Sequence, residues 1–204
     1  ETEKRAGRDG QYGQVTVQPK VVNMNGKESI LTTSNFGQVD VEQILTFSKS
    51  STTGLYDTAL IKYRFTNKDE EPHKIGLRVM MDTMLGTNDG APFRVGEKAI
   101  TTDTFFMKGS LPDFWQAFDA LSQPKVTAQG TIKGPDVTTP DKVYFADWGS
   151  MADGLWDFQF QPGSDFLRKG EFELDSAIAL YWAPEYLEPG QSVTYVTKYG
   201  LGGI

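Results

Sequence analysis

The sequence predicts an all-β chain that folds as an antiparallel two-sheet β-sandwich, with at most one or two short helical turns. Apolar and polar side chains alternate in several stretches, so one side of each extended segment can be buried. The 21 glycines and 10 prolines supply frequent turns, and turns about ten residues apart are typical of sandwiches and barrels. No long amphipathic helix and no strand–helix alternation appears.

Four stretches alternate most strictly. Residues 60–65 and 75–82 carry apolar side chains at their odd positions and are separated by a polar turn. Residues 177–182 and 193–199 repeat this pattern around a second turn that contains Pro189 and Gly190. Two alternating segments joined by a short polar turn are typical of a β-hairpin. We therefore expect each pair to form adjacent antiparallel strands.

Weaker strand patterns fill most of the remaining chain. They lie at residues 15–18, 30–33, 39–47, 98–106, 125–133, 142–148, 158–161 and 171–174. Only residues 112–121 and 150–156 have the composition of a helical turn or two. Because no linker interrupts residues 14–200, we expect one sandwich domain there, preceded by a polar arm at residues 1–13 and followed by the start of a linker at residues 201–204.

Charge and hydropathy exclude two classes of partner. The net charge is -7 and the basic residues form no cluster, so the chain should not bind nucleic acid. No apolar run approaches the roughly 20 residues that a membrane-spanning helix needs, so we expect no membrane insertion. Cysteine is absent, as in many bacterial surface proteins.

Several short motifs resemble segments of large bacterial secreted β-sandwich modules, the galactose-mutarotase-like supersandwich group. The motifs are Tyr63-x-Phe65-x-Asn67, His73-x-Ile75-Gly76-Leu77-Arg78, Asp82-Thr83 and Leu187-x-Pro189-Gly190-x-Ser192. The resemblance implies a supersandwich fold and an extracellular, cell-surface or periplasmic location. Catalytic members of the group use histidines with a glutamate, whereas this chain has one histidine, His73, in a turn.

The loop that follows the strand at residues 75–82 offers hard oxygen ligands. Asp82, Asn88 and Asp89 lie close together in a stretch rich in glycine, and carboxylate and amide oxygens are the ligands that Ca²⁺ prefers. The spacing does not match an EF-hand. A turn in which Asn88 and Asp89 bond the nearby backbone is the alternative. Calcium is the only cofactor that the sequence suggests, and the inventory of one histidine and no cysteine excludes a His/Cys zinc site.

A second stretch alternates aromatic residues with carboxylates. Asp147, Trp148, Trp156 and Asp157 could bind a glycan, because aromatic rings stack on sugars and carboxylates accept hydroxyl protons; packing of the indoles in the sandwich is the alternative. Two carboxylates could also act as acid and base on a glycoside. Arg78 joins these residues as a candidate ligand-binding residue if a second layer covers its side of the sheet.

These features favour a non-catalytic extracellular or cell-surface module, secreted by a bacterium, that binds glycan or a neighbouring protein. A carbohydrate-active enzyme domain, either a glycoside hydrolase or an epimerase-like protein, is one alternative. A structural subunit of a surface layer or filament, joined through residues 1–13, is the other.

Overall fold

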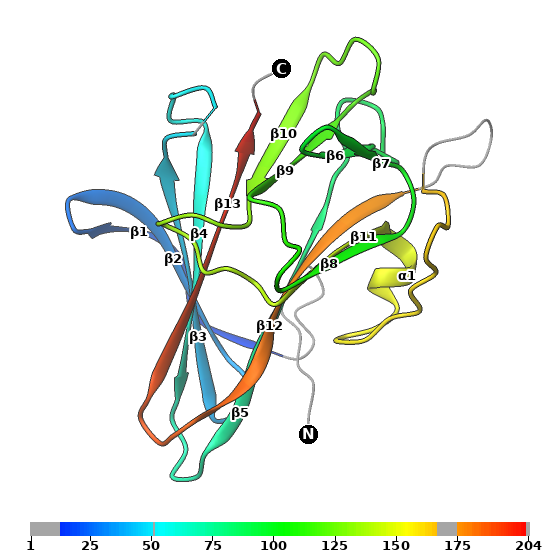
Figure 1. Ribbon diagram of the computed structural model, residues 1–204. Helices are drawn as coiled ribbons and strands as arrows, with labels where there is room; N and C mark the ends of the chain where they lie inside the picture. The colour runs from blue at the N-terminus through cyan, green and yellow to red at the C-terminus, as the bar shows by residue number, and fades with distance from the viewer. Residues whose placement is uncertain (1–12, 51, 167–174, 203–204) are drawn as a thin grey trace.

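The computed structural model describes residues 13–50, 52–166 and 175–202, which form two antiparallel sheets packed face to face (Figure 1). The larger sheet has nine strands in the order β1-β2-β3-β4-β13-β10-β9-β6-β7, and the smaller has four in the order β5-β12-β11-β8. Both confirm the predicted sandwich. The strands are β1 Gln14–Met24, β2 Lys27–Asn35, β3 Val39–Ser48, β4 Thr58–Asn67, β5 His73–Asp82, β6 Phe93–Val95, β7 Lys98–Ile100, β8 Thr104–Met107, β9 Phe114–Phe118, β10 Thr127–Thr131, β11 Lys142–Asp147, β12 Ser176–Leu187 and β13 Ser192–Leu201.

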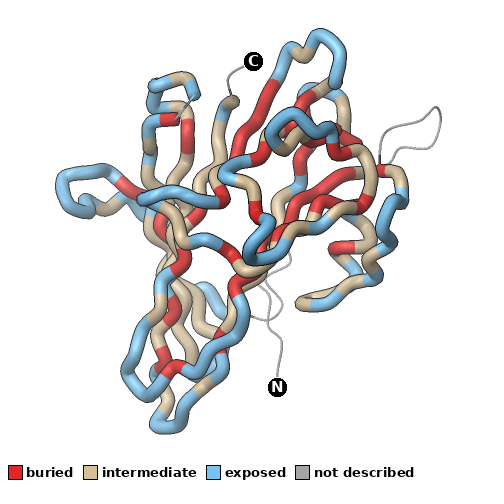
Figure 2. The backbone as a smooth tube through the Cα atoms, in the orientation of Figure 1, coloured by how far each residue is buried: buried red, intermediate tan, exposed pale blue. Residues whose placement is uncertain are grey.

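The main core lies between the two sheets, where buried segments concentrate in Figure 2. Phe93 sits at its centre and contacts the rings of Trp115, Phe145 and Phe166 at centroid distances of 4.9–5.9 Å. All four side chains are completely buried. Burial of each such aromatic side chain stabilises the fold by roughly 1.5–3 kcal/mol.

The strongest strands do not pair as the hairpin rule predicts. β4 pairs with β3 and β13 in the larger sheet, whereas β5 pairs with β12 in the smaller. The turns at residues 68–72 and 188–191 are therefore arches that carry the chain from one sheet to the other. The expected pairings of residues 60–65 with 75–82, and of 177–182 with 193–199, are wrong. Alternation predicts that a segment is a strand with one buried face, but an arch and a hairpin leave the same pattern in the sequence.

The other departures are local. Residues 112–121, expected to hold a helical turn, contain strand β9 instead. The strand expected at 98–106 is divided into β7 and β8 by residues 101–103, and residues 158–161 form no strand. The strand expected at 171–174 lies outside the described residues. A single-turn helix, α1 (Trp148–Ala152), begins two residues before the predicted one. Among the described residues, no helix is long and apolar enough to cross a membrane.

A third layer covers the outer face of the smaller sheet. Met151 of α1 is completely buried against small side chains of the sheet, and Trp156, Phe158 and Phe160 of the following segment pack around it. Alanines at 146, 177 and 179 leave room for these larger side chains. The smaller sheet is thus enclosed on both faces, which accounts for the unbroken buried run from Ser176 to Trp182.

Candidate functional site

Three carboxylates meet at the end of β5. Asp82 is its last residue, Asp89 lies in the loop that follows, and Asp175 directly precedes β12. One carboxylate oxygen from each lies within 4.8 Å of the other two. The pairing of β5 with β12, which sets Asp82 opposite Ala177, brings Asp175 to this end of the sheet. We call these three residues the carboxylate cluster.

Buried hydroxyls hold the backbone beneath the cluster. Ser176 and Thr83 are completely buried, and the Thr83 hydroxyl donates to the carbonyl oxygen of Ser176 at 2.8 Å. The Ser176 hydroxyl donates to the carbonyl of Ala91, and its backbone N–H donates to the carbonyl of Asp89. These bonds join the strand end, the loop and the start of β12, so the carboxylates are held by a rigid frame.

The pKa values of Asp175 and Asp82 are raised above the ordinary value of an aspartate. Burial, followed by the negative charges of Asp82, Asp89 and Asp147, raises the pKa of Asp175 to about 7. Burial and the charge of Asp89 also raise the pKa of Asp82. The Oδ1 atom of Asp175 is buried and accepts no hydrogen bond from the described residues. Such a group can retain a proton near neutral pH, or lose that proton to solvent when a bound cation neutralises the repulsion.

The side-chain nitrogen of the predicted ligand Asn88 is engaged outside the cluster, while its Oδ1 atom is buried and accepts no hydrogen bond from the described residues. Its side-chain amide donates to the carbonyl oxygen of Asp119 at 2.9 Å, and its backbone exchanges two hydrogen bonds with Leu85. The bond to Asp119 is not the local bond of the alternative interpretation, because the two residues are 31 positions apart. Asp82 and Asp89, two of the predicted ligands, lie together in the carboxylate cluster. Sequence reasoning missed Asp175, because a contact between residues so distant in sequence leaves no local pattern.

The predicted glycan residues Asp147 and Trp148 lie beside the same cluster. The Asp147 carboxylate caps α1 by accepting hydrogen bonds from the N–H and hydroxyl of Ser150 at 2.8 and 3.0 Å. The backbone N–H of Trp148 donates to the carbonyl of Asp175 at 3.1 Å. The Trp148 residue is 39% exposed, a large fraction for an indole. The two stretches that the sequence singled out separately therefore meet at Asp175.

Arg78 lies under the covering layer. Its guanidinium donates to the carbonyl oxygens of Met151, Gly154 and Leu155 at 2.6–3.0 Å. It also lies over the rings of Phe158 and Tyr181, at 5.6 and 5.5 Å from their centroids. The second layer anticipated for Arg78 is present, and the two terminal nitrogens of the guanidinium donate to backbone carbonyls of that layer. Arg78 therefore holds the segment that contains α1 against the smaller sheet.

Trp156 and Asp157 belong to the same layer. The Trp156 ring meets Tyr181 edge to face at 5.2 Å, and its carbonyl accepts a hydrogen bond from the Tyr181 hydroxyl at 2.9 Å. Asp157 is exposed. The Trp156 indole is therefore engaged in packing, in contrast to the more open indole of Trp148.

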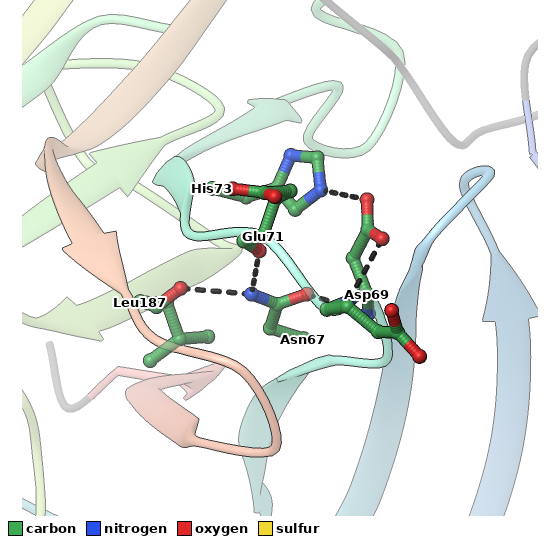
Figure 3. Close-up of polar contacts among 6 residues, drawn as sticks. Asn67, Asp69, Glu71, His73 and Leu187 are labelled. Carbon is green, nitrogen blue, oxygen red and sulfur yellow. Dashed lines mark hydrogen bonds and ion pairs between the residues drawn. The ribbon is translucent and has the colours of Figure 1, made fainter.

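His73 stands far from the carboxylates. It is the first residue of β5 and Asp82 is the last of the strand's 10 residues, so at about 3.3 Å per residue the two ends lie about 30 Å apart. The His73 ring is paired with the Asp69 carboxylate at 2.7 Å (Figure 3). The pair lowers the pKa of Asp69. A histidine and the cluster cannot act on one small substrate in this geometry.

Comparisons with known proteins bear on the fold. No family model and no curated protein matches the sequence. Among solved structures, the chain is similar to a candidate aldose 1-epimerase from Escherichia coli K12 (10% identity, TM-score 0.53), with 92% of this chain and 69% of that chain covered. A galactose mutarotase related enzyme from Lactobacillus acidophilus matches at 8% identity and a TM-score of 0.48, with coverages of 92% and 72%. At 10% identity, the likeness to the Escherichia coli structure shows that the two chains share a fold.

Proposed function

We propose that the chain is a non-catalytic glycan-binding module that works outside the cytoplasmic membrane, and that Trp148 and the carboxylate cluster form its binding site. The proposal rests on one observation at Asp175. The backbone N–H of Trp148, a partly exposed residue, is hydrogen-bonded to the backbone of Asp175, whose side chain belongs to the carboxylate cluster. Sugar recognition uses this combination, because the apolar face of a pyranose stacks on an aromatic ring while its hydroxyls donate to carboxylates.

Calcium is the cofactor that suits the cluster. The three carboxylates of Asp82, Asp89 and Asp175 supply hard oxygen ligands, and a divalent cation would favour the deprotonated form of Asp175. A calcium ion held there would leave coordination positions for sugar hydroxyls. In this proposal Trp148 orients the sugar, and the carboxylates bind it through the ion or directly.

A glycan array probed with and without calcium tests the proposal. Binding should be saturable and should fall about tenfold when Trp148→Ala removes a single stacking partner. Tyr186→Ala is the matched control, since Tyr186 is an aromatic residue with 71% exposure near the opposite end of β12. Equal binding by the Trp148→Ala variant and the wild-type protein would contradict the assignment.

A second function is favoured by the raised pKa of Asp175. A carboxyl group with a pKa of about 7 can act as a general acid near neutral pH. One oxygen from each carboxylate lies within 4.8 Å of the others, which is less than the roughly 6.5–9.5 Å that leaves room for a water in inverting glycosidases. The spacing therefore favours the retaining type, in which Asp82 or Asp89 would be the nucleophile. Incubation with glycosides and aldoses, followed by NMR of the products, separates the two functions. Turnover that Asp175→Asn abolishes would establish the enzyme.

A further inference from the structure

A cleft of about 410 Å³ lies on the outer face of the nine-stranded sheet. Adjacent residues of a strand point to opposite faces. Trp115 and Tyr199 stack in the core, so their neighbours Phe114 and Lys198 point outward into the cleft. The pairing of β9 with β10 sets Thr131 beside Phe114, which makes a floor shared by three adjacent strands. The cleft thus lies on the face of the larger sheet opposite the core, and it shares no residue with the carboxylate cluster.

The cleft carries positive charge in an acidic protein. Three lysines line it, Lys49, Lys133 and Lys198, together with two carboxylates, Asp113 and Asp136. Three positive and two negative charges leave a formal charge of +1, whereas the whole chain carries -7. The Lys133–Asp113 and Lys198–Asp136 pairs are both 3.0 Å long. Lys49 lies over the Tyr56 ring at 5.4 Å and supplies the excess cation.

The cleft also offers an aromatic face. Phe114 is 39% exposed, although the next residue along β9, Trp115, is completely buried. The cleft volume lies in the range of roughly 300–1,000 Å³ that small-molecule sites occupy. An exposed phenyl ring, carboxylates held by lysines and one excess cation together suit a ligand with an apolar face, several hydroxyl groups and one negative charge.

We infer that this outer cleft binds an acidic sugar residue, of which a uronic acid is the simplest case. Phe114 stacks on the sugar ring, the Asp113 and Asp136 carboxylates accept hydrogen bonds from its hydroxyl groups, and the Lys49 ammonium pairs with its carboxylate. The inference does not depend on the site proposed at Trp148, because no residue is shared between them.

Calorimetric titration with tri-galacturonate tests the inference, with neutral galactotriose and inorganic sulfate as matched probes. The wild-type protein should bind tri-galacturonate and bind the other two at least about tenfold more weakly, since each lacks one of the two recognition elements. Phe114→Ala should weaken binding about tenfold. Lys49→Gln should weaken it about threefold and reduce its dependence on salt.

Two control variants keep the result interpretable. Lys108→Gln removes an exposed lysine outside the cleft and should leave binding unchanged, and Trp148→Ala should also leave tri-galacturonate binding at the outer cleft unchanged. If galactotriose bound as tightly as tri-galacturonate, the preference for an acidic sugar would be overturned. If sulfate bound as tightly, the cleft would be an anion site with no sugar recognition. If tri-galacturonate did not bind, the inference would be overturned. Loss of binding in the Trp148→Ala variant would place the ligand at the other site.

Discussion

The side-chain amide of Asn67 donates a hydrogen bond to the carbonyl oxygen of Leu187 at 2.9 Å, from one sheet-crossing arch to the other (Figure 3). The same amide donates to the carbonyl of Glu71 at 2.8 Å, and the Asn67 side-chain oxygen accepts from the N–H of Asp69. Asn67 is completely buried. A single side chain therefore satisfies backbone groups of both arches where the two sheets separate.

Replacement of Asn67 by alanine should destabilise the fold by about 2–4 kcal/mol, because three backbone groups lose their buried partner. Urea unfolding followed by tryptophan fluorescence measures the change. Thr66→Ala is a suitable control, since the Thr66 hydroxyl makes an exposed contact with Ser192. A loss below about 0.5 kcal/mol for Asn67→Ala, as expected of an ordinary surface change, would contradict the role of Asn67.

Replacement of Arg78 by methionine should loosen the layer that carries α1. The substitution keeps an apolar stem and removes the donors to Met151, Gly154 and Leu155, so about 1.5–3 kcal/mol of charged hydrogen bonding is lost. Hydrogen exchange should accelerate in residues 148–160 more than in β12. Uniform acceleration throughout the domain would show that Arg78 stabilises the whole sandwich instead.

Asp175 should make the domain less stable as pH rises. Its pKa is raised from 3.8 to about 7 in the folded protein, so between these values the folded state holds a proton that the unfolded state has released. The free energy of unfolding therefore falls as pH rises through this window, and the raised pKa of Asp82 acts in the same direction. Melting midpoints at pH 5 and pH 8 measure the effect.

Asp175→Asn should flatten this dependence and raise the midpoint at pH 8 by about 2–4 °C, the shift that corresponds to about 1 kcal/mol in a domain of this size. Asp153→Asn, at an exposed carboxylate outside the cluster, should leave the dependence as it is. If the Asp175→Asn variant melted like the wild-type protein at both pH values, the repulsion would not exist.

Calcium should stabilise the wild-type protein at pH 8. At a concentration one hundred times its dissociation constant, a ligand that binds only the folded state adds about 2.7 kcal/mol. The effect should shrink at pH 5, where Asp175 is protonated, and should disappear in Asp89→Asn. Identical melting curves in calcium and in chelator would show that the carboxylate cluster binds no calcium. The carboxylates would then have to bind the glycan directly.

Period-two alternation predicted the strongest strands because each has a face that packs in the core, as with Phe65 and Val79. It could not assign those strands to sheets. The arch at residues 68–72 differs from a hairpin through long-range contacts such as that between Asn67 and Leu187, which no local pattern records. The composition of residues 112–121 suggested a helical turn, but Trp115 packs against Phe93 and Tyr199 from strand β9.

The candidate site was partly predictable for the same reason. Four of its residues lie in short sequence segments of unusual composition, and this composition identified them as candidates: Asp82, Asp89, Asp147 and Trp148. Asp175 completes the site through the pairing of β5 with β12, which is a tertiary relationship. Arg78 was identified as a residue that needs partners if covered, but only the folded structure shows that backbone carbonyls fill that role.

The most direct test of the account is an NMR titration of the Asp175 side-chain carboxyl carbon, with and without calcium. The burial of Asp175 beside Asp82 and Asp89 predicts that its carboxyl group titrates with a midpoint of about 7 without the metal. The titration midpoint should be lower when calcium is bound. A midpoint near 3.8 in both conditions would contradict it, because Asp175 would then be an ordinary solvated carboxylate.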